Sequence, residues 1–350
     1  MKDIRCLLAL MITLLNLSGC AGRSGVASAT GVALGVATGD SAVQGLASYS
    51  PEEIKKFISA NGDVNLNPIW NFYGIKAEPF ERYNQPYVSY EAEIFPIALY
   101  QEATEDALLR ISLGSSYRFL IFKGLDKDGG GGSGAWKYLG FVDIDGQQYG
   151  PPEHQIMIGD RVRWLSLKEL WGRGTGVSRY GLKWYEINGD GKELRAVLGF
   201  PVKGHQFTCE PYSARSFSSK IIEQGTAGGS YEVKVEFSVS YDFEDCHRRN
   251  GSEPKSLELF SKTQTATYVW NSQAHKFVLA KSKSELSDDE IDAVYNFDSL
   301  DEDEFLEYNF EELKTLASRG NAEQKEWLNL YLSDLPDSKR KRTLGKTLTQ

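Results

Sequence analysis

A β-like stretch between about residues 87 and 281 limits the folds open to this chain more than any other feature. Short segments rich in aromatic and β-branched residues alternate there with turn residues such as Asp145-Gly146. Between Tyr231 and Tyr241, apolar and polar residues alternate at every position, as they do in a strand with one buried face. Since no helical pattern separates the strands, we expect antiparallel sheets.

Several segments of this stretch are predicted to be strands. They are Tyr87–Leu99, Leu108–Leu113, Tyr117–Phe122, Trp136–Ile144, Val162–Leu167, Gly181–Ile187, Leu194–Phe200, Tyr231–Tyr241, Thr265–Trp270 and Lys276–Ala280. The last two are predicted to form a hairpin through Asn271-Ser272-Gln273, and Asn188-Gly189-Asp190-Gly191 is also predicted to be a hairpin turn. Gly172–Gly176 is Gly-rich but opens no helix, so it is interpreted as a β-turn or loop rather than a phosphate site.

Helical patterns flank the β-like stretch. Ser50 and Glu53 form a capping-box pattern for a short helix that ends near Ala60. Further capping boxes start at Ser287 and Ser299, helical spacing links Leu306, Phe310, Leu313 and Ala317 up to Gly320, and Asn321 caps a helix that stops before Pro336. We therefore predict an α+β protein that is mainly β, with antiparallel sandwich-like or curved sheets and a helical C-terminal subdomain. The β-rich domain is expected at 49–284, the helical subdomain at 285–336 and a solvated basic tail at 337–350.

Composition and charge exclude several classes of protein. The 350 residues are 41% hydrophobic and 12% aromatic, which is too apolar for a disordered chain. The formal net charge of -9 disfavours contact with phosphate backbones, so nucleic acid is not an expected partner. No cofactor is expected from any motif.

The N-terminus carries a targeting pattern. Lys2 and Arg5 precede an apolar run from Cys6 to Leu17, which is too short to span a bilayer but suits a secretory signal. The run ends in Leu17-Ser18-Gly19-Cys20, which resembles the lipobox of bacterial lipoproteins. This resemblance covers residues 1–20 and implies cleavage after residue 19 and a diacylglyceryl group on Cys20.

The resemblance implies a protein of the cell envelope that contacts the membrane through its N-terminal lipid anchor. Ala21 follows the lipidated position, and this residue implies sorting to the outer membrane in a Gram-negative cell. Residues 20–48 are rich in Gly, Ala and Ser and are interpreted as a flexible tether. A helix with small residues at Gly31, Gly35 and Gly39, similar to glycine-zipper segments of envelope proteins, is the alternative.

Cleavage and lipidation would leave two cysteines, Cys209 and Cys246. Because the implied compartment is oxidising, we predict that these two residues form a disulfide. Two separate buried thiols are the alternative.

Aromatic residues are the remaining functional indication. Trp136, Trp171, Trp184 and Tyr185 lie in the central β-region and are candidates for stacking on a sugar or peptide ligand. The alternative is that they fill the core of the β-structure.

Three functions remain open from the sequence. The first is a lipid-anchored, non-enzymatic binding or assembly module whose partner is an envelope protein or a glycan. The second is an envelope hydrolase that acts on glycan or peptide with carboxylates such as Asp143, Asp145 or Glu186. The third is a calcium-stabilised binding module, although the acidic loops at 126–129 and 188–191 lack the oxygen ligands of an EF-hand, and no metal ligands are assigned.

Overall fold

The computed structural model describes residues 49–60, 66–76, 90–99, 106–125, 136–147, 149–159, 162–207, 214–243, 257–295 and 302–349. The chain divides into a unit at Met1–Leu46, which lies outside these ranges, and a unit at Ala47–Gln350 that holds every described element. The second unit contains two sheets and a C-terminal helical region, which confirms the predicted α+β, mainly β class. Cys20, Cys209 and Cys246 lie outside the described residues.

The smaller sheet has five strands in the order β1-β2-β3-β4-β8. Its strands are β1 (Glu91–Ile97), β2 (Asp106–Leu113), β3 (Ser116–Gly124), β4 (Trp136–Ile144) and β8 (Lys192–Glu193). All pairs are antiparallel except β4 and β8, which run parallel. Gly140 of β4 allows this close approach, because a Cβ there would lie 2.5 Å from the Lys192 carbonyl oxygen.

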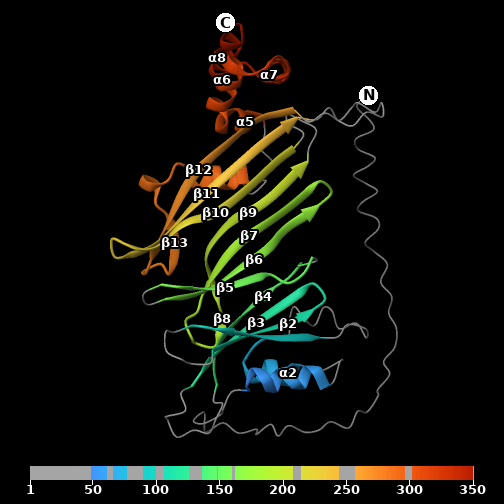
Figure 1. Ribbon diagram of the computed structural model, residues 1–350, viewed down its shortest axis with the longest axis vertical. Helices are drawn as coiled ribbons and strands as arrows, with labels where there is room; N and C mark the ends of the chain where they lie inside the picture. The colour runs from blue at the N-terminus through green and yellow to red at the C-terminus, as the bar shows by residue number, and fades with distance from the viewer. Residues whose placement is uncertain are drawn as a thin grey trace, which may run out of the picture. The chain divides into compact units, whose positions relative to one another are not determined.

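The larger sheet has eight antiparallel strands in the order β13-β12-β11-β10-β9-β7-β6-β5 (Figure 1). They are β5 (Glu153–Ile158), β6 (Arg163–Gly174), β7 (Val177–Glu186), β9 (Arg195–Phe207), β10 (Ala214–Ala227), β11 (Ser230–Phe243), β12 (Leu257–Asn271) and β13 (Lys276–Leu279). The predicted β12–β13 hairpin is confirmed. The predicted hairpin at Asn188–Gly191 is wrong, because this turn leads from β7 in the larger sheet to β8 in the smaller one.

The larger sheet curls until its two ends meet. Trp164 of β6 lies 5.4 Å from the ring of Trp270 on β12 and 5.3 Å from the ring of Phe277 on β13. Four other strands separate β6 from β12 in the sheet order, so these contacts require strong curvature. Arg195 of β9 also donates to the carbonyl oxygens of Ala274 and His275, at the tip of the β12–β13 hairpin.

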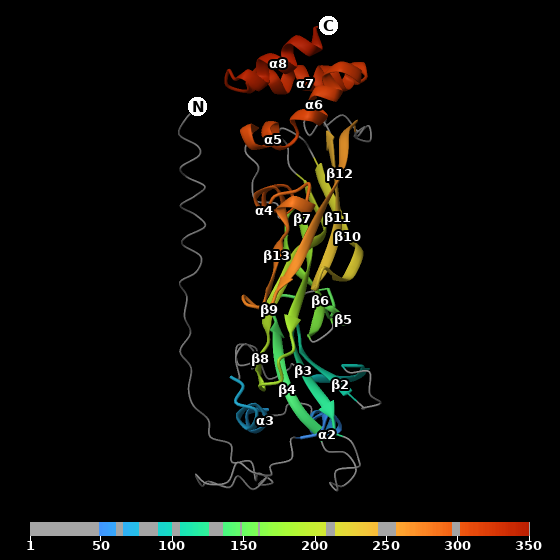
Figure 2. The same ribbon diagram turned by 90° about the vertical axis from the view of Figure 1, so that its left-hand side faces the viewer.

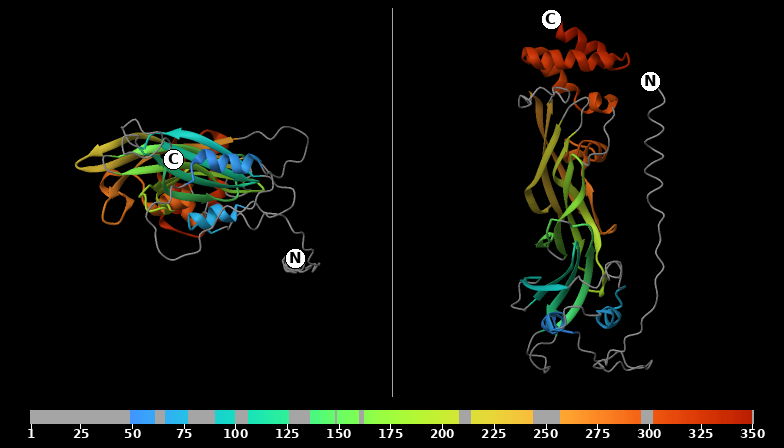
Figure 3. Two further views of the ribbon diagram at one scale, coloured as in Figure 1. Left: turned by 90° about the horizontal axis from the view of Figure 1, so that it is seen from below. Right: turned by 90° about the vertical axis from the view of Figure 1, so that its right-hand side faces the viewer.

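The smaller sheet is buried on both faces. One face, with Leu109 and Phe122, packs against helices α2 (Pro51–Ala60) and α3 (Asn67–Phe72), which Figure 3 shows from below. The opposite face, with Phe119 and Val142, packs against the larger sheet. The predicted cap of α2 is confirmed, because the Glu53 backbone N–H donates to the Ser50 hydroxyl at 3.1 Å.

The C-terminal region packs helices against the larger sheet (Figure 2). Its elements are η3 (Lys281–Lys283), α4 (Asp288–Glu290), η4 (Ile291–Tyr295), α5 (Glu302–Tyr308), α6 (Phe310–Arg319), α7 (Ala322–Asp334) and α8 (Lys339–Leu348). The capping boxes at Ser287 and Asn321 are confirmed. The box predicted at Ser299 lies outside the described residues.

Two details of this region differ from the expectations. The single helix predicted up to Gly320 is divided into α5 and α6 at Asn309, which is fully buried and donates to the Phe305 carbonyl oxygen at 2.9 Å. The predicted solvated tail contains α8, whose basic side chains Lys339, Arg340 and Arg342 are exposed while Leu344 is buried. Among the helices of the described ranges, none combines the length and the apolar character that crossing a bilayer requires.

Candidate functional site

Three cavities share lining residues with one another, and the middle one lies where the two sheets meet. The acidic cleft, of about 810 Å³, is lined by Lys76, Asp143, Asp145 and the segment from Asp190 to Glu193. The central pocket, of about 400 Å³, shares Asp143 and Asp145 with the cleft and adds Glu169, Trp171, Arg179, Lys183 and Tyr185. The β13 pocket, of about 430 Å³, shares Trp171 and Lys183 with the central pocket and extends to β9, β12 and β13. These sizes match those of small-molecule sites.

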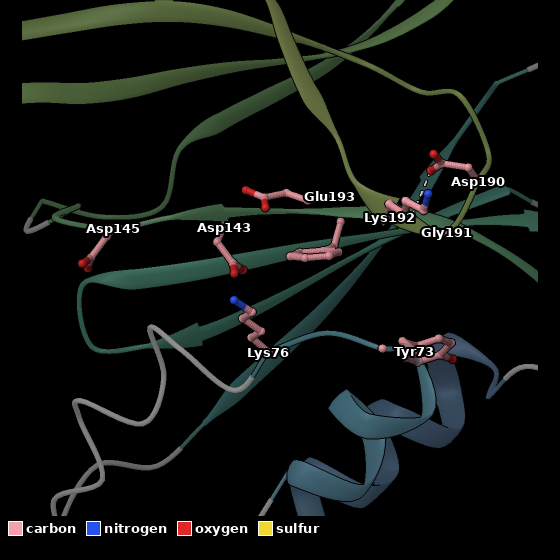
Figure 4. A pocket seen from close by; sticks show the side chains of 10 residues that line it. Tyr73, Lys76, Asp143, Asp145, Asp190, Gly191, Lys192 and Glu193 are labelled. Carbon is pink, nitrogen blue, oxygen red and sulfur yellow. Dashed lines mark hydrogen bonds between the residues drawn. The ribbon is translucent and has the colours of Figure 1, made fainter.

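The acidic cleft lies between the end of α3 and the turn that leads into β8. Gly189 and Gly191 adopt positive φ angles of 73° and 74°, which let the chain turn sharply there. The Asp190 carboxylate closes the turn by accepting from the Lys192 backbone N–H at 3.0 Å. Figure 4 shows the Lys76 side chain pointing toward Asp143, with Glu193 on the opposite side of that carboxylate.

Arg118 of β3 binds two residues that line the acidic cleft, Asp143 and Lys76. Its guanidinium donates to both oxygens of Asp143, at 2.6 Å each, and to the Lys76 carbonyl oxygen at 3.0 Å. The same group lies 4.4 Å from the ring centroid of Trp70 and 5.4 Å from that of Phe141. The Arg118 side chain is fully buried, so this bidentate pair joins the segment after α3 to β3 and β4.

Burial raises the pKa of Asp143 above its ordinary value of 3.8. Arg118 opposes this shift, while Glu193 and Asp145 add to it. A carboxyl whose pKa is raised by folding stabilises the fold at low pH, and this contribution is lost as the pH rises through the folded-state pKa.

We therefore predict that Asp143 titrates with a midpoint above 3.8 in the folded protein. Carboxyl ¹³C NMR would measure the midpoint, and an Asp143→Asn variant would identify the resonance. In an Arg118→Met variant the midpoint should rise further, because the opposing charge is lost. A wild-type midpoint at or below 3.8 would contradict the assignment.

Trp171 forms a flat platform on the larger sheet. It is the extra residue of a β-bulge, since Leu170 pairs with Tyr180 while Gly172 pairs with Arg179. Its indole lies on Gly181 of β7, where a Cβ would come within 1.9 Å of the ring. The Gln147 side chain supports the bulge by accepting from the Leu170 N–H at 2.8 Å and donating to its carbonyl oxygen at 3.2 Å.

Glu169 lies beneath the central pocket and is 3% exposed. It accepts a hydrogen bond from the Tyr185 hydroxyl at 2.6 Å and pairs with the Lys183 ammonium at 3.0 Å. Burial, reinforced by the Glu169 charge, raises the pKa of Tyr185, so this hydroxyl stays protonated and donates. These contacts hold the Lys183 ammonium 5.7 Å from the centroid of the Trp171 ring.

The structure separates the predicted aromatic residues. Trp171 and Tyr185 line the same pocket, where Tyr185 is 7% exposed and its hydroxyl donates to Glu169. Trp184 is fully buried against Trp164 and Phe277, so its assignment as a ligand-binding residue is wrong and the alternative of a core residue holds. Trp136 is half-buried beside Phe122 in the smaller sheet and lines none of these three cavities.

The structure also separates the predicted carboxylates. Asp143 and Asp145 line the same two cavities. Glu186 lies elsewhere, with its carboxylate 2.9 Å from Nδ1 of His275 and 3.8 Å from the Arg195 guanidinium. Sequence reasoning missed Arg118, Gln147, Glu169 and Gly181, because their roles depend on partners that are distant in the chain.

The described residues offer no group of three or more His, Cys, Asp or Glu side chains suited to a metal ion. In the loop at 188–191, the Asp190 carboxylate accepts from a backbone N–H and the Asn188 side chain faces the Asp190 N–H at 3.4 Å. The other acidic loop considered for calcium, at 126–129, lies outside the described ranges. Comparison with protein-family models, curated proteins and solved structures finds no match for this chain.

Proposed function

We propose that this protein is a lipid-anchored, non-enzymatic binding module of the cell envelope, with its ligand site in the central pocket. The lipobox-like sequence that ends at Cys20 supports the anchor, and Ala21 favours the outer membrane of a Gram-negative cell. Residues 20–48 would then serve as the tether between the lipid and the folded body.

The partners of the acidic side chains in the central pocket favour a binding function over a catalytic one. Every acidic side chain that lines the central pocket already has a partner within the protein. Asp143 is paired with Arg118, Asp145 accepts from the Ser116 hydroxyl at 2.6 Å, and Glu169 binds Tyr185 and Lys183. Hydrolysis by a carboxylate pair uses one group as the acid and the other to attack the sugar or activate water, and here both oxygens of Asp143 are held by Arg118. Partnered carboxylates are better suited to hold a polar ligand in a fixed orientation.

The anchor predicts a labelling result. In cells fed radiolabelled palmitate, the wild-type protein should incorporate label and a Cys20→Ala variant should not, because acylation needs the thiol at this position. A Cys6→Ala variant is the matched control and should label like the wild type, since Cys6 lies in the cleaved segment. Equal labelling of the wild type and Cys20→Ala would refute the anchor.

A hydrolase that uses Asp143 and Asp145 is the second candidate. The raised pKa of Asp143 favours it, because a general acid must hold its proton near the working pH. Incubation of the purified protein with peptidoglycan and polysaccharides separates the two functions. Turnover that disappears in Asp143→Asn would establish the hydrolase, and saturable binding without turnover would support the binding module.

We also propose the Cys209–Cys246 disulfide. Ala214 of β10 pairs with Phe207 on one side and with Asp242 on the other. The described ends of β9 and β11 that precede the two cysteines therefore lie at the same end of the larger sheet, separated by one strand. This arrangement of the two strand ends, together with an oxidising compartment, supports the pairing.

A further inference from the structure

We propose that Trp171 is the stacking platform for a sugar ring of an uncharged glycan chain, which extends through the central pocket into the β13 pocket. This inference rests on the proposed binding function and names the chemical class of its ligand.

The Trp171 indole packs on the backbone of the neighbouring strands β7 and β9. A side chain at Gly181 would overlap the ring, and a Cβ at Gly199 of β9 would lie 3.9 Å from its edge. The β-bulge and the two Gln147 hydrogen bonds hold the backbone on either side of Trp171. A flat aromatic surface held in advance loses little conformational freedom when an apolar ring face packs on it.

The surrounding charges disfavour ionic ligands. The Lys183 ammonium lies near the Trp171 ring, so a second cation approaching this indole would meet a positive charge. Lys183 and the 3% exposed Glu169 form one ion pair, and Asp145 lies at the same pocket, so a polyanion gains no uncompensated positive charge from this pair. The pocket wall instead holds carboxylates, which accept hydrogen bonds, next to Lys183 and Arg179, which donate them. The hydroxyl groups of a neutral sugar can both donate and accept, so they suit this wall.

The cavities favour a chain over a single ring. Trp171 and Lys183 line both the central pocket, of about 400 Å³, and the β13 pocket, of about 430 Å³. The rest of the central pocket comes from β4 and the residues that follow it, and from β6 and β7. The rest of the β13 pocket comes from β9, β12, β13 and α4. The indole therefore lies between two hollows, and a ligand stacked on it can extend into each of them.

Binding of defined oligosaccharides to the full chain in detergent solution tests the proposal. The uncharged probes are maltohexaose, cellohexaose and chitohexaose, and the charged probes are polygalacturonate and a chitosan oligomer. We expect at least one uncharged hexasaccharide to bind saturably by isothermal titration calorimetry. In Trp171→Ala its affinity should fall about tenfold or more, because the stacking surface is removed.

Two further variants separate stacking from a general loss of structure. Gly181→Ala keeps the tryptophan but displaces its ring, so it should weaken binding like Trp171→Ala. Trp136→Ala removes a tryptophan outside these cavities and should bind like the wild type. Circular dichroism at the assay temperature would confirm that each variant used is folded.

The outcomes distinguish the sugar proposal from the binding function on which it rests. Failure of all uncharged hexasaccharides to bind, or wild-type affinity in Trp171→Ala, would overturn the Trp171 proposal. Binding of only a charged probe, sensitive to Asp145→Asn, would also overturn it while leaving a binding module at this site. The palmitate experiment is independent of every one of these results.

Discussion

Replacing Trp164 with alanine is expected to lower the free energy of unfolding by about 3–5 kcal/mol. The side chain is 1% exposed and contacts Trp184 and Tyr231 in addition to Trp270 and Phe277. It thus fills the space where the two ends of the curled sheet meet. Removing the indole would leave a cavity between β6 and the β12–β13 hairpin that neither side can easily close, since both are held in the same sheet.

Urea denaturation followed by far-UV circular dichroism and by tryptophan fluorescence would measure this loss. Leu330→Ala is the matched control, because Leu330 of α7 is 60% exposed and its truncation should change stability by less than about 0.5 kcal/mol. A loss below about 1 kcal/mol in Trp164→Ala would show that the curl does not depend on this contact.

Replacing Arg118 with methionine is expected to destabilise the protein by about 3 kcal/mol at neutral pH. Loss of one partner of a buried pair leaves the other charge uncompensated, which costs about 3–5 kcal/mol. We expect the lower end of this range because the Asp143 side chain is 18% exposed and keeps some access to water. The destabilisation should shrink at a pH low enough to protonate Asp143, since no unpaired charge then remains.

A double variant separates the charge effect from the packing effect. Arg118→Met combined with Asp143→Asn should recover part of the lost stability, because the uncompensated carboxylate is removed. Lys168→Met breaks an exposed pair with Glu153 and should cost less than about 1 kcal/mol. Equal denaturation midpoints for Arg118→Met and Lys168→Met would refute the role given to Arg118.

Both replacements bear on the candidate site as well as on stability. Arg118 fixes Asp143 and the Lys76 carbonyl, which lie at the acidic cleft. Trp164 holds the β12–β13 hairpin near β6, and this hairpin forms one wall of the β13 pocket. The cavities therefore depend on contacts between segments that are distant in the sequence.

Much of the local structure could be predicted from the sequence. The capping boxes at Ser50, Ser287 and Asn321 are confirmed, because a cap depends on residues within one turn. The alternating segment Tyr231–Tyr241 lies within β11, since its period of two leaves one face to be buried. Strands β5, β8 and β10 are not predicted from the sequence. Much of β10 is polar, and it becomes a strand because β9 and β11 pair with it on both sides.

The candidate site was predicted less completely than the fold. Trp171 and Trp184 are predicted together, because composition does not distinguish a half-buried tryptophan at a pocket from a core residue. The distinction depends on Gly181, which is close to Trp171 only because β6 and β7 pair with a bulge. Asp143 and Asp145 are predicted together with Glu186, and only the first two line the acidic cleft, because they lie at the end of β4 whereas Glu186 ends β7 in the other sheet.

By itself, the sequence determined the periodic pattern of strands, the helix caps, the acidic charge and the lipobox-like N-terminus, because each of these depends on residues that are neighbours in the chain. The tertiary structure alone decided the order of the strands, the curl of the larger sheet and the surroundings of Trp171 and Arg118. The physical reason is that burial and pairing depend on contacts between segments far apart in the sequence. Local propensity does not encode which of many similar strands become neighbours.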